Sequence, residues 1–168
     1  MATITTLSNP LYATANVAPR TMDNANFAYR VWREIDLAAA ATAKGSALAA
    51  ADVIEALRLP AGVQILAAGA QKTAAMTGTS TDLTFDIGIT GVDADIYVDG
   101  WDFDAAAVGS YGTPAGVQTP ALILSASDTI DILFATQTGT VTGGKVMVWA
   151  VIVDVTNEQR GVIAQPKS

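Results

Sequence analysis

Apolar and polar residues alternate with a period of two along parts of this chain, which predicts antiparallel β-strands with one buried face. Residues 82–90 give the clearest case, because every second side chain is apolar and polar or small residues fill the positions between. Residues 26–37 follow the same rule, with Arg33 interrupting the apolar side and Trp32 on the polar side. The apolar positions of the two segments are Leu83, Phe85, Ile87 and Ile89, and Phe27, Tyr29, Val31, Ile35 and Leu37.

Residues 144–157 carry a different pattern, because nearly every position from Val146 to Val153 is apolar. The segment contains Trp149, is rich in β-branched residues and is too short for a membrane span, which needs about 20 apolar residues. A strand that is apolar on both sides is buried on both sides. The pattern therefore predicts a central strand with sheet or another subunit on each side.

The other strands are shorter, and turn residues set their limits. Residues 52–59 fit either a strand that turns at 60–62 or a helix that Ser46 caps and Pro60 ends; the β-rich surroundings favour the strand. Asp99-Gly100 separates two apolar runs, which predicts a hairpin turn. Further strands are expected at 63–68, 96–98, 101–104, 120–125 and 128–135, with connections at 38–51 (a loop or short helix), 69–81, 105–119 and 137–144.

About eight to ten short strands separated by frequent turns predict an all-β fold. Eight strands in two sheets with long end loops are typical of the jelly roll. We therefore expect a jelly-roll-like antiparallel sandwich with an extended N-terminal arm. We therefore divide the chain into three parts: the arm over residues 1–25, the sandwich domain over 26–157 and a polar C-terminal tail over 158–168.

Two segments are candidates for contact with a partner. The N-terminal arm is rich in Thr, Ala and Asn, and a disordered terminus is the alternative, but its apolar residues are unusual for a purely solvated tail. The 105–119 loop is long enough to indicate a binding role. Tryptophans in such a chain are more often core or interface anchors than ligand sites. The expected interface residues are Leu7, Leu11, Tyr12, Val17, Tyr111 and Trp101.

The charge composition narrows the class of partner. Only 15% of residues are charged while 51% are hydrophobic, so part of the surface is expected to be buried in an assembly. The net charge of −7 disfavours binding to nucleic acid, because an acidic protein repels phosphate backbones. The first residues lack the basic region and apolar core of a secretory signal, and no stretch is long enough to cross a bilayer.

The absence of two residue types bears on catalysis. The chain has no cysteine and no histidine, which excludes thiol chemistry, cysteine zinc sites and the Ser-His-Asp triad. Residues 139–145 have the glycine and lysine spacing of a phosphate-binding loop, but Val146 follows the lysine and a strand replaces the required helix. We therefore expect no enzyme activity and no cofactor.

One group of carboxylates could bind a hard cation such as calcium, but its spacing does not match an EF-hand loop. The competing interpretation, which we favour, is that these residues are the solvent-facing neighbours of apolar strand positions. A catalytic carboxylate pair for glycoside hydrolysis is a remoter alternative. The group consists of Asp93, Asp95, Asp99, Asp102 and Asp104.

Four segments together resemble small virion proteins of tailed bacteriophages, in particular the head decoration (cement) proteins of podovirus- and siphovirus-like phages. The Leu-Pro-Ala-Gly turn at 59–62 and the closing Gly-Lys-Val strand at 144–154 carry most of the likeness, which spans roughly residues 27–157. The segments are Asp52–Gly62, Leu83–Gly88, Asp128–Leu133 and Gly144–Asp154.

The resemblance implies a homotrimeric jelly-roll protein on the outer surface of a capsid, assembled in the host cytoplasm. It would bind across neighbouring major capsid protein subunits and carry no catalytic residues. Two alternatives remain open at this point. One is a phage tail or head-fibre component, although no repeat or heptad pattern is present. The other is a carbohydrate-binding β-sandwich, with or without calcium.

Overall fold

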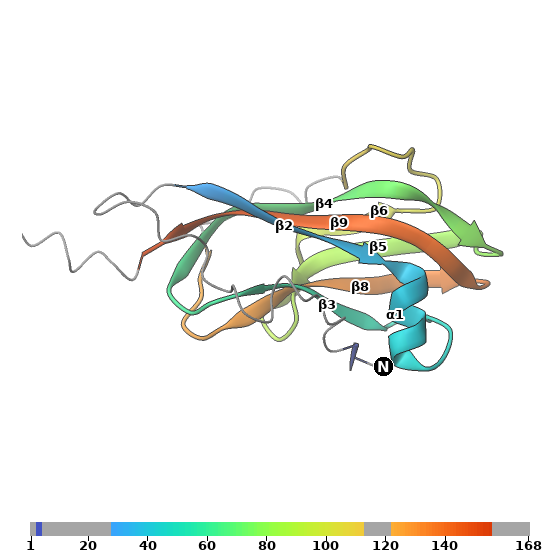
Figure 1. Cartoon of the computed structure of the whole chain (residues 1–168), viewed down its shortest axis with the longest axis horizontal. Coiled ribbons are helices and arrows are strands. Elements are labelled where there is room, and N and C mark those ends of the chain that lie inside the picture. Colours follow the sequence, from blue (N-terminus) through green and yellow to red (C-terminus); the bar gives the residue numbers. More distant parts are fainter. Residues whose placement is uncertain (1–2, 5–27, 113–121, 156–168) are drawn as a thin grey trace, which may run out of the picture.

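Two β-sheets pack face to face in the computed structural model (Figure 1), which describes residues 3–4, 28–112 and 122–155. One sheet has the strand order β1-β3-β8-β5-β6, and the other has the order β2-β9-β4-β7. The elements are β1 (Thr3–Ile4), β2 (Tyr29–Asp36), α1 (Leu37–Lys44), β3 (Val53–Leu59), β4 (Val63–Gly78), β5 (Asp82–Ile89), β6 (Asp93–Asp102), β7 (Leu122–Ile123), β8 (Asp128–Thr138) and β9 (Val141–Asp154).

Strands β2 to β9 have the connectivity of a jelly roll. Numbered one to eight along the chain, they lie in the orders 1-8-3-6 and 2-7-4-5, and every ladder among them is antiparallel. The remaining strand, β1, lies parallel to β3 at the edge of the five-stranded sheet. The predicted all-β jelly-roll sandwich is therefore confirmed.

The core lies between the sheets and follows the alternation of the sequence. All four apolar positions of β5 that the pattern selects are fully buried. The ring of Phe85 packs at 4.8 Å from that of Phe134 and at 4.6 Å from that of Phe103, so β5, β8 and the segment after β6 meet there. Aromatic pairs at such distances contribute beyond the area that they bury.

Strand β9 is central, as its composition predicts, but its two faces differ. Val146, Val148 and Ala150 point between the sheets and are fully buried. The alternate residues Met147 and Trp149 point to the outside of the four-stranded sheet and are only half-buried. Within one chain, the second sheet covers one face of β9, as expected. The opposite face of β9 remains partly exposed.

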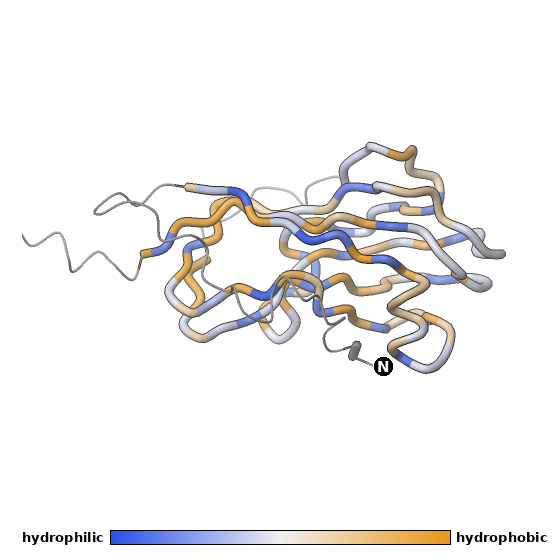
Figure 2. The backbone as a smooth tube through the Cα atoms, in the orientation of Figure 1, coloured by the Kyte–Doolittle hydropathy of each residue, from blue (hydrophilic) through white to orange (hydrophobic). Residues whose placement is uncertain are grey.

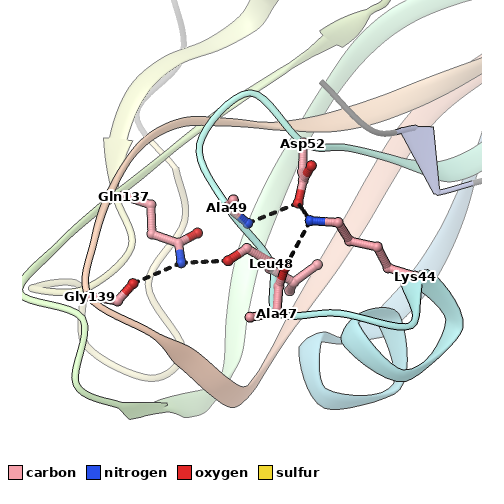
Figure 3. A network of polar contacts seen from close by, with 7 residues as sticks. All are labelled: Lys44, Ala47, Leu48, Ala49, Asp52, Gln137 and Gly139. Carbon is pink, nitrogen blue, oxygen red and sulfur yellow. Dashed lines mark hydrogen bonds and ion pairs between the residues drawn. The ribbon is translucent and has the colours of Figure 1, made fainter.

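Helix α1 and the chain after it close one end of the sandwich. Asp36 caps the helix, because its side chain accepts hydrogen bonds from the backbone N–H groups of Ala38 and Ala39. Lys44 at the other end forms an ion pair with Asp52 and donates to the Ala47 carbonyl at 2.8 Å (Figure 3). Together these contacts fix the connection from α1 to β3.

The same connection is also tied to β8. Gln137 donates to the carbonyl oxygens of Leu48 and Gly139 at 2.8 and 3.2 Å, and the backbone of Ala51 donates to Phe134 (Figure 3 shows the Gln137 contacts). Ala51 has a left-handed backbone with φ of 65°. The segment 38–51, predicted as a loop or short helix, contains both, because α1 ends at Lys44 and a loop follows to β3. The preference for a strand over 52–59 is confirmed by β3.

Two sequence predictions about turns are wrong, and a third turn is shorter than predicted. The predicted connection over 137–144 covers only residues 139–140, because β8 runs to Thr138 and β9 begins at Val141. Residues 69–81 are not a connection, because β4 continues through them to Gly78 alongside β9. Asp99-Gly100 is not a hairpin turn, because β6 runs through it and the ladder to β5 shifts register there. Gly100 adopts φ of 59° and donates its N–H to the Asp86 carboxylate at 2.7 Å, so Asp-Gly forms a bulge inside a strand.

The predicted arm and C-terminal tail fall almost wholly outside the described residues. The exception is β1, whose residues Thr3 and Ile4 pair with Val53 and Ile54 of the same chain. The three-part division of the chain stays a prediction. Among the described residues, α1 is the only helix and has eight residues, and no helix has the length and hydropathy of a membrane span.

Candidate interaction surface

The outer face of the four-stranded sheet is apolar and aromatic, and we call it the β2-β9-β4-β7 face. Its large exposed side chains are Trp32 on β2 (55% exposed), Leu66 at a bulge of β4 (41%) and Ile123 on β7 (54%). Figure 2 shows hydrophobic residues gathered where β9 ends and β4 begins. Exposed apolar patches on a soluble domain indicate a binding surface.

Three aromatic side chains cross this face in a row. Trp32 and Trp149 are direct cross-strand partners on β2 and β9, and Gly69 is the partner of Trp149 on β4. The ring of Tyr111 lies edge-on to that of Trp149, with centroids 6.5 Å apart. Arg30 places its guanidinium carbon 5.3 Å from the centroid of the Trp149 ring. Tryptophan, tyrosine and arginine are the residues that most often dominate the energy of protein interfaces.

Tyr111 is held in this row because the loop after β6 is fastened to the edge of β4. The Tyr111 backbone forms a β-bridge with Gln71, and the Gln71 side chain donates to the Gly109 carbonyl at 2.9 Å. Backbone hydrogen bonds join Lys72 to Ser110 and Gly109, and Gly112 to Ala70. The second half of β4, which sequence reasoning mistook for a connection, thus provides the support for this loop.

Lys72 anchors the start of the same loop from inside the sandwich. Its ammonium donates to the carbonyl oxygens of Phe103, Ala106 and Asp104 at 2.7, 2.8 and 3.3 Å, and the residue is only 3% exposed. The nitrogen also lies 4.7 Å from the centroid of the Phe103 ring. Burial lowers the pKa of Lys72, whereas the nearby carboxylates of Asp104 and Asp102 raise it. Three acceptors satisfy all three N–H groups, which suits a charged ammonium.

The outer face of the five-stranded sheet has the opposite character. Register places acidic side chains on it from β3, β5, β6 and β8, with Arg58 as their basic neighbour. Three of them accept backbone hydrogen bonds: Asp86 from Gly100, Asp102 from Ala105 at 2.9 Å, and the buried Asp131 from Thr90 at 3.2 Å. Within the described ranges, no three acidic side chains are placed to share a metal ion. The acidic positions are Glu55, Asp82, Asp86, Asp102 and Asp131.

Comparison with solved structures finds proteins with a similar fold. No protein-family model matches the sequence, and no curated protein matches it significantly. A chain from the capsid of Ralstonia phage GP4 superposes with a TM-score of 0.57 and 18% identity, covering 79% of this chain and 88% of that one. A chain of the cyanophage Pam1 capsid asymmetric unit gives 0.51 and 13%, covering 84% and 98%.

The chain shares its fold with components of two bacteriophage capsids. At these identities the likeness concerns the fold, and it agrees with the jelly-roll connectivity of β2 to β9. Both superpositions cover at least 88% of the capsid chain, so the common unit is nearly the whole of each relative.

The predicted interface residues differ in their exposure to solvent, and four of them lie outside the described residues. Tyr111 is 53% exposed and belongs to the β2-β9-β4-β7 face. Trp101 is 6% exposed and packs edge-on against Phe85 and Phe103, so it offers little surface to a partner. Leu7, Leu11, Tyr12 and Val17 lie outside the described residues.

The expected interface residues did not include three that the structure exposes on this face: Trp32, Leu66 and Ile123. A signal existed for Trp32, because it falls in phase with Arg30 and Glu34 on the polar side of its strand. Leu66 is exposed by a β-bulge, and the alternation of the sequence does not reveal where a bulge falls.

Proposed function

We propose that this chain is a non-enzymatic virion structural protein that decorates and stabilises a bacteriophage capsid by binding across neighbouring major capsid protein subunits. The observation that carries the proposal is the aromatic and apolar β2-β9-β4-β7 face on a jelly roll of the kind found in the two phage capsids. The opposite face would remain in solvent, where its exposed carboxylates, such as those of Asp82 and Asp102, are hydrated.

The contact would act through burial of the exposed side chains on this face. Trp32, Tyr111 and Ile123 are each about half exposed, so covering them contributes roughly 1 kcal/mol each. Such a contact is weak for a single copy. Many copies that each bridge two shell subunits would add up to a large stabilisation against outward pressure.

The N-terminal segment is proposed as a second contact. Its apolar residues Leu7, Leu11, Tyr12 and Val17 would bind a neighbouring subunit, in the manner that the resemblance to cement proteins suggests. Deletion of residues 1–20 should leave the sandwich folded and lower the occupancy on particles. The same resemblance supports a homotrimer on the outer capsid surface. Light scattering of the purified chain would test the three-fold association.

The first experiment is sedimentation of the chain with density-purified virus particles from its source. A copy number near that of the major capsid protein, or a simple fraction of it, supports the proposal. A few copies per particle would indicate a tail or head-fibre component instead. Absence from particles would overturn the virion role.

Variants then test which face makes the contact. Trp32→Ala and Tyr111→Ala should each lower particle occupancy without loss of folding. Val92→Ala is the matched control, because Val92 is 59% exposed but lies at the turn between β5 and β6. Equal occupancy for all three variants would remove the β2-β9-β4-β7 face from the proposal.

The aromatic row favours a second candidate, a carbohydrate-binding sandwich, because sugar rings stack on exposed tryptophan and tyrosine. Binding of the chain to a glycan array that is lost in Trp32→Ala, together with absence from particles, would establish this function in place of the first.

A further inference from the structure

Strand β2 lies at the edge of its sheet with a regular ladder to β9. All eight of its residues pair with β9, and in the described part of the chain it has a ladder partner on that side only. A long edge strand presents a row of backbone donors and acceptors to any matching strand. The side chains of β2 therefore decide which strand it can accept.

We propose that the β2 edges of two copies of this chain pair antiparallel about a two-fold axis at Trp32, so that the four-stranded sheet continues into the second copy. In this register Trp32 lies opposite Trp32 of the second copy. Arg30 lies opposite Glu34 of the second copy, and symmetry repeats that pair on the other side of the axis. Opposite charges and aromatic pairs directly across a ladder are stabilising.

Neighbouring registers are disfavoured by the same side chains. An axis at Arg33 would set Arg33 opposite its own copy, and an axis at Glu34 would do the same for Glu34. Like charges directly opposite one another destabilise a ladder. An axis at Val31 would place Arg30 opposite tryptophan and leave Glu34 opposite Ala28, so both charge pairs are lost. The charges thus select one register.

Contacts within the chain already orient the side chains that this pairing uses. Arg30 lies over the Trp149 ring, and Glu34 accepts a hydrogen bond from Lys145 at 3.2 Å. Both therefore remain on the outer face of the sheet, where the partner strand would meet them. Arg33 points the other way and donates to the Ala56 carbonyl of β3 at 3.3 Å, so it stays clear of the charge pairs.

The contact is isologous and joins copies in pairs. A chain that also forms the proposed three-fold contact would assemble as paired trimers, so the expected mass is that of two or six chains. The inference does not depend on capsid binding, because its test uses the purified full-length chain alone.

The test uses two single variants, Arg30→Glu and Glu34→Arg, in sedimentation velocity over a concentration series. Arg30→Glu makes positions 30 and 34 both acidic, and Glu34→Arg makes them both basic, so each variant meets like charges in its own pair. Each should halve the assembled mass and raise the dissociation constant about tenfold or more. An equal mixture of the two restores opposite charges at both pairs and should recover the wild-type mass.

Changes inside each chain cannot produce this recovery, because the altered contacts with Trp149 and Lys145 are the same alone and in the mixture. Arg58→Glu is the matched control: it reverses an exposed arginine on the other sheet and should assemble as the wild type does. Circular dichroism confirms that every variant is folded. The proposal is overturned if the wild-type chain does not assemble into two or six copies. It is also overturned if the mixture of Arg30→Glu and Glu34→Arg associates no better than either variant alone.

Discussion

The indole of Trp149 lies against the backbone of Gly69 on the neighbouring strand. A Cβ atom at position 69 would lie 3.1 Å from Cζ2 of the indole and 3.3 Å from Cε2. Glycine at this position therefore leaves the space in which the central ring of the aromatic row rests. The position of Trp149, between Arg30 and Tyr111, depends on that space.

Replacing Gly69 by valine should displace the indole and disrupt the β2-β9-β4-β7 face. The branched side chain would overlap the ring, so the free energy of unfolding should fall by about 1–2 kcal/mol. Tryptophan fluorescence should shift to the red as the ring becomes more exposed. Ala67→Val is the control, because Ala67 lies on the same face one pair further along β4, opposite Val151. Identical fluorescence for both variants would contradict this account.

Lys72→Met should loosen the loop that presents Tyr111. The change keeps the length of the side chain but leaves the carbonyl oxygens of Phe103, Asp104 and Ala106 without their donor. The cost should be about 2–4 kcal/mol in urea unfolding. Amide exchange at Gly109 and Gly112 should accelerate, because their hydrogen bonds join the loop to β4.

Lys145→Met is the control for Lys72→Met. Among the described residues, Lys145 forms one ion pair, with Glu34, and its side chain is 43% exposed, so its loss should change stability by less than about 1 kcal/mol. A destabilised Lys72→Met variant with unchanged exchange at Gly109 and Gly112 would show that the lysine supports the core and not the loop.

The sequence predicted the fold well where burial of one face decides the structure. The alternation in β5 specifies a half-buried strand, because a shift of register by one residue would turn Phe85 and Ile87 away from the core. It failed at Gly69–Gly78, where small residues suggest a connection. There the long strand β9 supplies the ladder partner, and this tertiary pairing outweighs the weak strand propensity of alanine and glycine.

The surface was harder to predict because it depends on contacts between distant segments. Trp101 and Tyr111 look equally suitable for an interface in the sequence, yet Trp101 packs beside Phe85 while Tyr111 is held outside by β4. The role of Lys72 rests on carbonyl groups more than 30 residues away, at Phe103 and Ala106. No local pattern reports such a contact.

Ala51→Gly should stabilise the protein. Ala51 has φ of 65°, a left-handed conformation that costs an L-residue about 1–2 kcal/mol and glycine almost nothing. Because glycine also gains freedom in the unfolded chain, the net increase should be up to about 1 kcal/mol. Thermal unfolding measures it. Ala50→Gly is the control, since Ala50 is also exposed but lacks the positive φ, and it should be slightly destabilising.

Tyr97→Phe should stabilise the protein and change its response to alkaline pH. Tyr97 is 4% exposed, and its hydroxyl has no hydrogen-bond partner in the described ranges. A buried hydroxyl without a partner is costly, so its removal should add about 1 kcal/mol at neutral pH.

Burial also raises the pKa of Tyr97 to about 12, above the value near 10 that tyrosine has in an unfolded chain. The unfolded state therefore loses its proton first, and the wild-type chain should lose stability as the pH rises from about 10 towards 12. Tyr97→Phe should lack this contribution. Urea unfolding at a series of pH values, with Tyr111→Phe as an exposed control, would reveal it as a smaller alkaline loss in the Tyr97 variant alone. Equal pH dependence in both variants would mean that the Tyr97 hydroxyl is hydrated in the folded protein.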